Sequence, residues 1–327
     1  MAGRKRILIV GAGGIGLKHI KAFNALENPP RLFAIDPRPE SRVRARELGV
    51  EALDALWEAL DLSKFDGVVI CAPAPMHVPY SIRCLNEGIP VLSEKPLSHA
   101  WGGVEDLLKI AGQEGVPSSG VAYVRRYHPL HEMARDLLAS GDLGEMLETR
   151  VVAGQPFTTY RPDYREIYYA SRAMGGGCLL DCASHMIDLV QYYLGPIGDM
   201  CGHIRHLALE GVEVEDTVSL SLDFRSGALG SIHVNQFQPL NETCIEFCGT
   251  DAVLRIIEPG FRCRVWRKGA TDWQDLDVPD GDYAYALQRQ AAAFLSAIDG
   301  GPPLRTSFAE AANTLRLCLD VLEENGR

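Results

Sequence analysis

The 327-residue sequence lacks three features, and each absence excludes a class of protein. No run approaches the roughly 18 to 20 apolar residues of a transmembrane helix, so we expect no membrane partner. Basic residues are in deficit, since 32 of them against 43 acidic residues give a net charge of −11, and this argues against a nucleic-acid partner. The nine cysteines form no CxxC pair and no disulfide framework, a usage typical of free thiols in a reducing compartment. We therefore expect a cytoplasmic protein.

Short apolar segments alternate with helical segments over roughly the first 120 residues. Such alternation is typical of βαβ units in a parallel sheet, and the near absence of charge in the strands fits a sheet covered on both faces. We expect an α/β domain with a doubly wound parallel sheet over residues 1–124. Its predicted strands are 6–10, 32–35, 67–71 and 91–93, and its predicted helices are 15–26, 41–48, 79–87 and 104–113.

After about residue 125 the pattern changes to short strands joined by tight turns, such as the turn at 225–227. This pattern indicates antiparallel pairing, with helices set apart from the strands. We expect a second, α+β domain over residues 125–327. Its predicted strands are 148–152, 218–224, 230–234 and 244–247, and its predicted helices are 181–194, 283–298 and 308–324.

A glycine-rich segment, GAGGIG at 11–16, follows the first strand and opens the first helix. This is the context that a dinucleotide-binding turn requires: Gly11 permits the tight turn, Gly13 lets the backbone approach the pyrophosphate, and Gly16 lets helix and strand pack closely. The phosphates would bind the free N–H groups at the helix N-terminus. The cofactor-binding residues expected here are Gly11, Gly13, Gly14, Ile15 and Gly16.

Asp36 stands twenty positions after Gly16, at the end of the second predicted strand. A carboxylate there accepts hydrogen bonds from the ribose hydroxyls and repels a 2′-phosphate, which favours NAD over NADP. Arg38 lies close enough to contribute to the same site, and Arg42 and Arg44 follow it. These arginines could hold a 2′-phosphate or could simply form a solvated helix face, so NADP stays the less favoured cofactor.

Two later loops follow strands of the same sheet, and ligands of open α/β sheets bind beyond the carboxyl ends of strands. Ala72, Pro73 and His77 follow the strand at 67–71 and are expected to line the nicotinamide ribose, although a proline-stiffened turn explains the sequence equally well. The tripeptide Glu94-Lys95-Pro96 follows the strand at 91–93. A lysine there can donate to a substrate oxygen whose charge changes during the reaction, and the alternative is an ordinary surface lysine.

The segment GGGCLLDCASH at 175–185 places Asp181 and His185 four residues apart, on one face of a predicted helix. Histidine is suited to remove a hydroxyl proton near neutral pH, and Asp181 could orient it or bind a substrate hydroxyl. The alternative is a polar pair that decorates a helix. Three preceding glycines indicate close backbone approach to a ligand. Cys178 and Cys182 lie nearby, but without the spacing or the second ligand pair of a zinc site, so we expect no metal.

Together these motifs resemble the glucose-fructose oxidoreductase / inositol dehydrogenase / rhizopine catabolism (Gfo/Idh/MocA) family, over the full length of the chain. The resemblance rests on GAGGIG with His19 three residues later, on Asp36, on the tripeptide at 94–96, and on GGG followed by Asp181, His185 and Asp188. Arg126-Tyr127-His128-Pro129 and the closing helices also look like family features.

This resemblance implies an N-terminal Rossmann domain that binds NAD(P) and a C-terminal domain with a large open, mostly antiparallel sheet. That sheet would supply the substrate wall and the interface of a homodimer or homotetramer. The catalytic residues would be Lys95, which polarises the substrate oxygen, His185 as acid/base, and Asp181 in support of both. It also makes the Lys95–Pro96 bond a candidate for the cis isomer.

A loop rich in tyrosine and arginine, at 160–172, precedes the three glycines. Aromatic rings stack on sugars, and arginines bind phosphate or carboxylate, so this loop favours a nucleotide sugar or a sugar acid over inositol or a neutral sugar. The alternative is that the arginines pair with acidic neighbours or with a partner subunit. The expected substrate-binding residues are Arg126, Tyr164, Arg165, Arg172, Asp181 and His185.

These observations predict an NAD-dependent dehydrogenase that transfers hydride between nicotinamide and a secondary hydroxyl or ketone of a sugar-like substrate. Two alternatives stay open. One is an enzyme that returns the hydride in each cycle, as an epimerase, lyase or glycosidase would. The other is a non-catalytic NAD-sensing regulator, although regulators of this fold tend to lose the catalytic lysine or histidine, and both are present here.

Overall fold

A computed structural model describes residues 4–326 of the chain. The chain forms two compact units, and each is described by itself. The first takes in the chain up to His128 together with 281–312, and the second takes in 129–280 together with the residues from Asn313 onward. Within residues 4–326, no helix has the length and apolar composition to cross a membrane.

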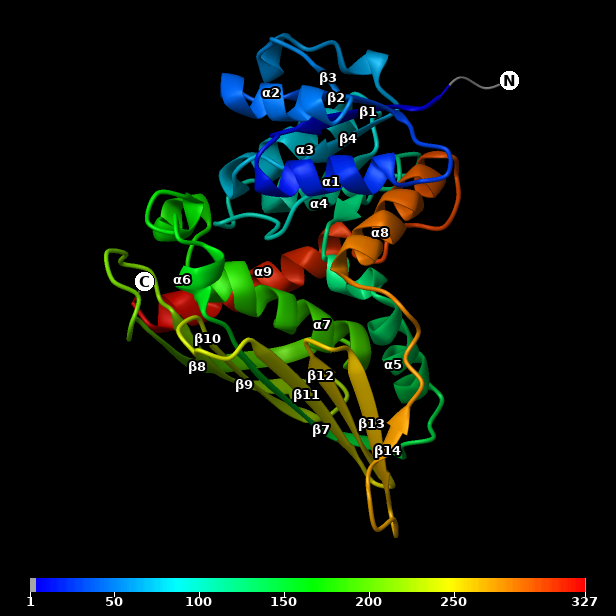
Figure 1. Cartoon of the computed structure of the whole chain (residues 1–327), viewed down its shortest axis with the longest axis vertical. Coiled ribbons are helices and arrows are strands. Elements are labelled where there is room, and N and C mark those ends of the chain that lie inside the picture. Colours follow the sequence, from blue (N-terminus) through cyan, green and yellow to red (C-terminus); the bar gives the residue numbers. More distant parts are fainter. Residues whose placement is uncertain (1–3, 327) are drawn as a thin grey trace. The chain divides into compact units, whose positions relative to one another are not determined.

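The first unit is built on a six-stranded sheet in the order β3-β2-β1-β4-β5-β6, with every neighbouring pair parallel. The strand order reverses between β1 and β4, and ligands of doubly wound sheets bind beyond the strand ends at such a point. Helices lie along this sheet in Figure 1. The strands are β1 (Arg6–Val10), β2 (Arg31–Ile35), β3 (Glu51–Ala52), β4 (Gly67–Ile70), β5 (Val91–Ser93) and β6 (Gly120–Val121). The helices are α1 (Gly14–Asn24), α2 (Pro39–Glu47), α3 (His77–Asn86), α4 (Val104–Ala111) and α8 (Tyr283–Ile298).

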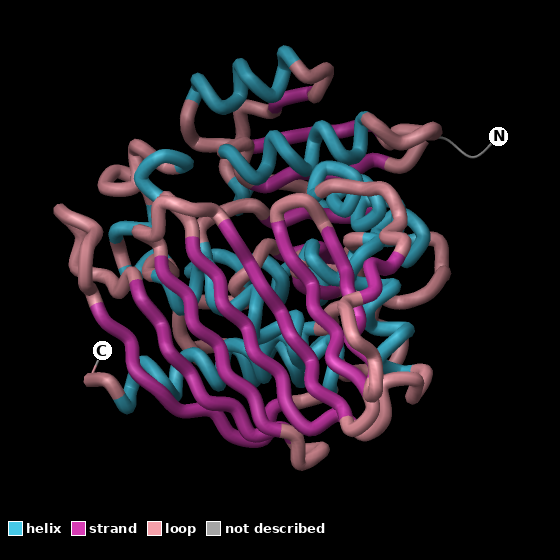
Figure 2. Tube along the Cα trace, turned by 60° about the horizontal axis from the view of Figure 1, so that its bottom comes forward, coloured by secondary structure: helices cyan, strands magenta, loops and turns pink. Residues whose placement is uncertain are grey.

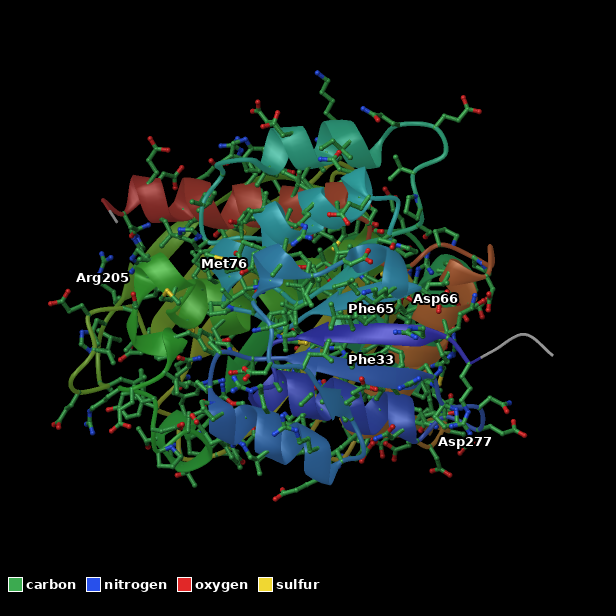
Figure 3. The ribbon with its side chains drawn as sticks, turned by 90° about the horizontal axis from the view of Figure 1, so that it is seen from above. Phe33, Phe65, Asp66, Met76, Arg205 and Asp277 are labelled. Atoms are coloured by element: carbon green, nitrogen blue, oxygen red, sulfur yellow. The ribbon has the colours of Figure 1, made fainter. Side chains whose placement is uncertain are left out.

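The core of this unit explains why its strands carry so little charge. Ile7 and Ile9 of β1 are fully buried, and Phe294 of α8 belongs to the same apolar cluster, so a helix from late in the chain covers part of the sheet. Beside this core, Phe33 and Phe65 pack edge to face with their centroids 5.3 Å apart (Figure 3). Full burial of a side chain of this size contributes about 1.5 to 3 kcal/mol.

The second unit is built on an eight-stranded sheet in the order β14-β13-β12-β11-β7-β10-β9-β8. The pair β7 and β10 is parallel, and the other neighbouring pairs are antiparallel. Figure 2 shows its strands side by side with helices behind them. The strands are β7 (Met146–Gly154), β8 (Ile197–Arg205), β9 (Thr217–Phe224), β10 (Leu229–Asn235), β11 (Glu242–Gly249), β12 (Ala252–Glu258), β13 (Arg262–Arg267) and β14 (Gln274–Leu276). The main helices are α5 (Pro129–Ala139), α7 (Ser184–Leu194) and α9 (Phe308–Glu324), and the division between the units falls within α9.

The two faces of this sheet differ in polarity. Val151 and Ile245 are fully buried on one face, whereas their strand neighbours Arg150 and Glu246 lie on the other. That second face carries ion pairs such as Arg255–Glu246, with nitrogen and oxygen 2.7 Å apart. Charged and apolar side chains share this face along β12 and β13. The sequence-based prediction missed both of these strands, and it also missed β8 and β14.

Candidate active site

The glycine-rich turn between β1 and α1 is tightly packed against its own backbone. Gly11 has a φ of +96°, and a Cβ there would lie 2.6 Å from the carbonyl oxygen of Cys71. A Cβ on Gly16 would overlap the carbonyl oxygen of Gly11. By contrast, a Cβ on Gly14 would have no neighbour within 4 Å, and α1 begins without a side-chain cap. Open space in front of an uncapped helix N-terminus fits a bound pyrophosphate, whose oxygens would accept from the first N–H groups of α1 around Ile15.

Asp36 directly follows β2 beside this turn, and its side chain is only 2% exposed. Its carboxylate accepts from the backbone N–H of Ala12 at 2.9 Å and from that of Arg38 at 2.9 Å. The Arg38 guanidinium, 56% exposed, lies over the carboxylate with Nε 3.1 Å from Oδ1. Burial alone would raise the pKa of Asp36, but the hydrogen bonds from Arg38 and Ala12 and the arginine's charge hold that pKa below its ordinary value. Asp36 is therefore an anion, in the position that a ribose-binding carboxylate requires.

The three arginines after Asp36 have different partners. Arg42 donates to the carbonyl oxygen of Asp36 at 2.8 Å and pairs with Asp54, and Arg44 donates to Ser41. Arg38 alone of the three reaches the glycine turn, since a Cβ on Gly13 would lie 3.2 Å from its Nη2. Arg38 is thus the arginine best placed to meet a 2′-phosphate.

The choice between NAD and NADP should depend on this Asp36–Arg38 pair. In Asp36→Asn, we expect the ratio of the Kd for NADPH to that for NADH to fall about 10- to 100-fold, because the repulsive carboxylate is gone while Arg38 is retained. Fluorescence titration with each reduced cofactor measures the ratio. Asp54→Asn is the matched control, since Asp54 is 85% exposed and pairs with Arg42. A ratio that stays unchanged in Asp36→Asn would show that Asp36 does not discriminate.

The tripeptide at 94–96 follows β5 and is held by two buried histidines. Nε2 of His19, on α1, lies 2.8 Å from Oε1 of Glu94, and the other carboxylate oxygen accepts the backbone N–H of Lys95 at 3.0 Å. On the other side, Nδ1 of His77 lies 2.7 Å from the carbonyl oxygen of Pro96. The Lys95–Pro96 peptide bond is cis.

His77 is 2% exposed, and its other ring nitrogen lies 2.8 Å from the carbonyl oxygen of Ala72. Burial lowers the pKa of His77 by more than the two carbonyl oxygens raise it. The ring therefore joins the loop after β4, which contains Ala72 and Pro73, to the loop after β5. Both ring nitrogens of His77 therefore contact backbone oxygens of the protein itself. Contact between the loop after β4 and the cofactor stays a prediction.

In the second unit, Asp181 lies in a π-helical turn, Leu179–Ala183, directly before α7, which carries His185. The predicted single α-helix from residue 181 is therefore wrong in its first turn, where the hydrogen bonds run from i to i+5. Short π-helical turns occur frequently at functional sites. The hydroxyl of Tyr168 donates to Oδ1 of Asp181 at 2.7 Å.

The glycines before this turn pack against the protein itself. A Cβ on Gly176 would overlap the carbonyl oxygen of Tyr169, and one on Gly177, whose φ is +96°, would lie 2.8 Å from the carboxyl carbon of Glu215. The buried Glu215 carboxylate also accepts the backbone N–H of Leu179 at 2.9 Å. The close approach expected from these glycines is thus made to Tyr169 and Glu215.

Four of the predicted substrate-binding side chains, all arginine or tyrosine, have partners within their own units. Nη1 of Arg126 donates to the carbonyl oxygen of Arg305 and to Glu310, and the residue is 3% exposed. Tyr164 is equally buried and donates to the carbonyl oxygen of Glu210, which also accepts from Nε of Arg165.

Arg172 forms an ion pair with Glu215, with nitrogen and oxygen 2.6 Å apart. The sequence predicted Tyr168 as a member of the aromatic loop and not as a separate site residue, and it did not predict Glu215. Tyr168 belongs to the same aromatic loop and is 46% exposed, whereas nothing in the local sequence distinguishes Glu215. Contact of the four predicted side chains with substrate stays a prediction.

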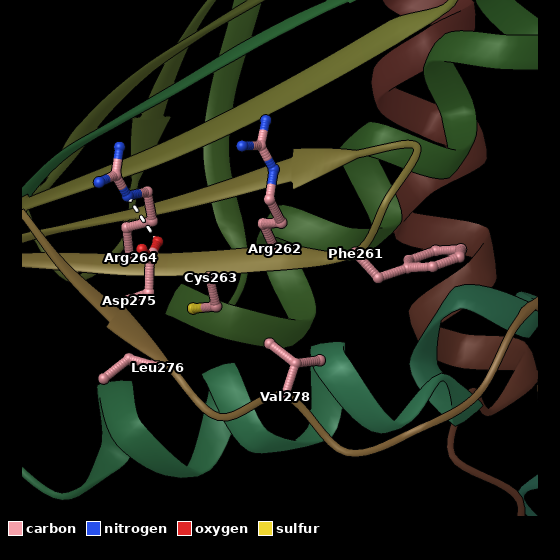
Figure 4. Close-up of a pocket in the computed structure, with 7 residues that line it drawn as sticks. All are labelled: Phe261, Arg262, Cys263, Arg264, Asp275, Leu276 and Val278. Atoms are coloured by element: carbon pink, nitrogen blue, oxygen red, sulfur yellow. Dashed lines mark ion pairs between the residues drawn. The ribbon is translucent and has the colours of Figure 1, made fainter.

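Two further kinds of site, a metal site and a surface hollow, can be checked in the described part of the chain. Among residues 4–326, no group of three or more His, Cys, Asp or Glu side chains could hold a metal ion. A hollow of about 300 Å³ lies at β13 and β14, and the Arg264–Asp275 ion pair lies at its wall (Figure 4). These strands are at the opposite edge of the sheet from β8, whereas the π-helical turn packs on β9 and β10. The residues that line the hollow are Phe261, Arg262, Cys263, Arg264, Asp275, Leu276 and Val278.

A Rossmann unit with an acidic residue after β2, joined in one chain to a unit with a large open sheet, indicates a two-domain dinucleotide-binding protein. Comparison with known families agrees. Residues 5–122 match the family model described as an oxidoreductase family with an NAD-binding Rossmann fold, and residues 131–255 match the GFO/IDH/MocA C-terminal domain. The chain belongs to the Gfo/Idh/MocA family of NAD-dependent oxidoreductases.

Individual relatives are distant in sequence. The chain is 24% identical to the rhizopine catabolism protein MocA of Rhizobium meliloti, covering 96% of this chain and 93% of that protein. It is 23% identical to an inositol 2-dehydrogenase of Corynebacterium glutamicum, with 90% and 86% covered. The fold is similar to that of levoglucosan dehydrogenase in complex with NADH and levoglucosan, with a TM-score of 0.88, 20% identity, and 98% and 97% of the two chains covered.

Proposed function

We propose that this protein is an NAD-dependent dehydrogenase of a neutral, sugar-like substrate such as a cyclitol or an anhydro-sugar. The observation that carries the proposal is the bond from the Tyr168 hydroxyl to Asp181, one turn before His185, on a turn held by Glu215. It supplies an oriented carboxylate and a half-exposed aromatic ring, the two groups that bind the hydroxyls and the apolar face of a sugar ring.

When bound, NAD supplies the hydride acceptor at nicotinamide C4. The residues of this chain would do the rest. His185 takes the hydroxyl proton, Asp181 orients the imidazole or a neighbouring substrate hydroxyl, and Lys95 stabilises the negative charge that develops on the substrate oxygen.

The state of the arginines supports a neutral substrate over an anionic one. Arg172 is paired with Glu215, and Arg165 donates to the carbonyl oxygen of Glu210 and lies over the ring of Tyr164 at 4.7 Å. The Glu215 carboxylate offsets the charge of Arg172, and the carbonyl oxygen of Glu210 orients Arg165 toward the protein, so both arginines attract an anionic substrate less strongly. The relative named inositol 2-dehydrogenase also supports a polyol. A nucleotide sugar or sugar acid is the alternative.

A substrate panel tests the proposal. The protein is incubated with NAD or NADP and with myo-inositol, scyllo-inositol, levoglucosan, glucuronate or a UDP-sugar acid, while NADH absorbance and thermal unfolding are recorded. We expect turnover with NAD and a neutral polyol. Turnover with the acids alone would favour the alternative substrate class. Product without net NADH would indicate a hydride-returning epimerase, lyase or glycosidase, and NADH binding without product would indicate a regulator.

We also propose self-association through the eight-stranded sheet into a homodimer or homotetramer. The sheet's open face supports this, because it presents an ordered row of ion pairs that includes Arg150–Glu148 and Arg255–Glu246, beside the half-buried Cys244. A face this large is usually covered by a partner. Light scattering on the purified protein measures the mass, and a monomer at micromolar concentration would contradict the proposal.

The Tyr168 hydroxyl should matter more for turnover than for substrate affinity. In Tyr168→Phe, we expect kcat with the neutral polyol to fall about 10- to 100-fold, because a hydrogen bond to a charged group contributes about 1.5 to 3 kcal/mol. KM should change less, since the ring remains. Tyr160→Phe is the matched control, because Tyr160 lies in the same loop and is 47% exposed. Equal kinetics in both variants would mean that the Asp181 contact has no part in catalysis.

A further inference from the structure

One buried carboxylate joins the helix after the glycine turn to the loop that carries Lys95. Glu94 is 7% exposed, and both of its oxygens are used. Oε1 lies 2.8 Å from Nε2 of His19, and Oε2 accepts the backbone N–H of Lys95 at 3.0 Å. His19 is fully buried in α1, one turn after Gly16. Helix α1 is thus linked to the backbone of Lys95 through the Glu94 side chain.

The geometry also fixes where the proton and the charge lie. Nδ1 of His19 is buried and meets no hydrogen-bond partner among residues 4–326. Nε2 is the ring nitrogen that faces the carboxylate, so the proton that His19 gives to Glu94 lies on Nε2. Burial alone would raise the pKa of Glu94, but the hydrogen bond from His19, its charge and the nearby Lys95 hold that pKa below its ordinary value. Glu94 is therefore an anion next to Lys95.

We propose that His19 is a positioning residue that acts through Glu94 on Lys95. This inference rests on the proposed function, in which Lys95 faces the substrate oxygen. By donating to Oε1, His19 keeps the carboxylate directed at the imidazole and at the Lys95 backbone. Both oxygens of Glu94 are then engaged by His19 and by the Lys95 backbone, so the carboxylate does not turn to the ammonium group.

Other titratable groups besides His19 and Lys95 interact with Glu94. His77 faces it from α3 and Cys71 from the end of β4, and both interact with its charge. Burial, and next the charge of Glu94, raise the pKa of the Cys71 thiol well above its ordinary value, so this group stays neutral. His77 contacts the backbone oxygens of Pro96 and Ala72, and the hydrogen bonds of the Glu94 carboxylate go to His19 and Lys95. A purely structural role for His19 would thus resemble that of His77, which gives the test its control.

The test measures the titration of Lys95 directly, without substrate or cofactor. The full-length protein is acetylated with a trace of acetic anhydride across a pH series, and mass spectrometry gives the labelling of each lysine. Lys18 and Lys21, exposed on the same helix α1, serve as internal references. In His19→Leu, Oε1 of Glu94 loses its donor and turns to the ammonium group. We expect the midpoint for Lys95 to rise by about 0.5 to 1 pH unit.

Three further variants make the result specific. His19→Gln retains a donor and should keep the wild-type midpoint. His77→Leu loosens the same tripeptide without touching the carboxylate and should also keep it. Glu94→Gln removes the negative charge and should lower the midpoint, the opposite sign to His19→Leu.

An unchanged midpoint in His19→Leu, or an equal rise in His77→Leu, would overturn the proposal. Thermal unfolding shows whether His19→Leu folds. If it does not fold, Glu94→Gln provides the test, and a Lys95 midpoint that does not fall in that variant would overturn the proposal. These measurements are independent of turnover, so they can succeed or fail separately from the proposed dehydrogenase activity.

Discussion

Lys95→Met is expected to lower turnover of the neutral polyol about 10²- to 10⁴-fold while NADH affinity stays within about threefold of wild type. Methionine keeps the length and the apolar stem of the side chain but has no charge and no donor. The negative charge that develops on the substrate oxygen would then be unpaired. Glu94, bound to His19 and to the backbone N–H of residue 95, should keep the loop in place. Initial rates from NADH absorbance and a fluorescence titration with NADH measure the two quantities.

The matched control is Lys109→Met, because Lys109 is exposed on α4 of the same unit. It should leave both quantities unchanged. Near-normal turnover in Lys95→Met would remove this lysine from the chemistry. A parallel loss of NADH affinity would instead assign Lys95 to cofactor binding.

The sequence predicted the first unit well because its constraints are local. A strand such as β1, buried on both faces, can hold only apolar residues, and Gly11 and Gly16 mark positions where any Cβ would meet backbone. These requirements are visible in a short stretch of chain. Membership of α8 in this unit was not predictable in the same way. The apolar stripe that includes Phe294 shows that one face of the helix is buried, but a stripe does not specify which sheet covers it.

The loop at 160–172 could not be predicted in this way, because the partners of its side chains are distant in the sequence. Its arginines indicated an anionic ligand, but Arg172 pairs with Glu215, 43 residues away, and Arg165 donates to Glu210, 45 residues away. Nothing local reveals such partners, so the sequence could not separate binding arginines from structural ones. The π-helical turn at Asp181 was likewise hidden, because one extra residue in a helical turn leaves the local composition unchanged.

Among glycine-to-alanine substitutions in the glycine turn, Gly16→Ala should lower the free energy of unfolding the most. Its Cβ would overlap the carbonyl oxygen of Gly11 and lie 3.0 Å from the carbonyl carbon, and both are backbone atoms that no rotamer change can move. Forcing α1 away from β1 should lower the free energy of unfolding by about 1 to 3 kcal/mol. It should also move the first N–H groups of α1, so that NADH affinity falls about 10- to 100-fold.

The same substitution two residues earlier is the control. Gly14 begins α1, and a Cβ there would have no neighbour within 4 Å, so Gly14→Ala gains helix propensity of up to about 1 kcal/mol without a clash. Thermal or urea unfolding should therefore show changes of opposite sign in the two variants. Equal stability would mean that the close packing of Gly16 on Gly11 is easily relieved. The glycines of the turn would then be required only for cofactor binding. In that case, Gly14→Ala would lower NADH affinity at least as much as Gly16→Ala does.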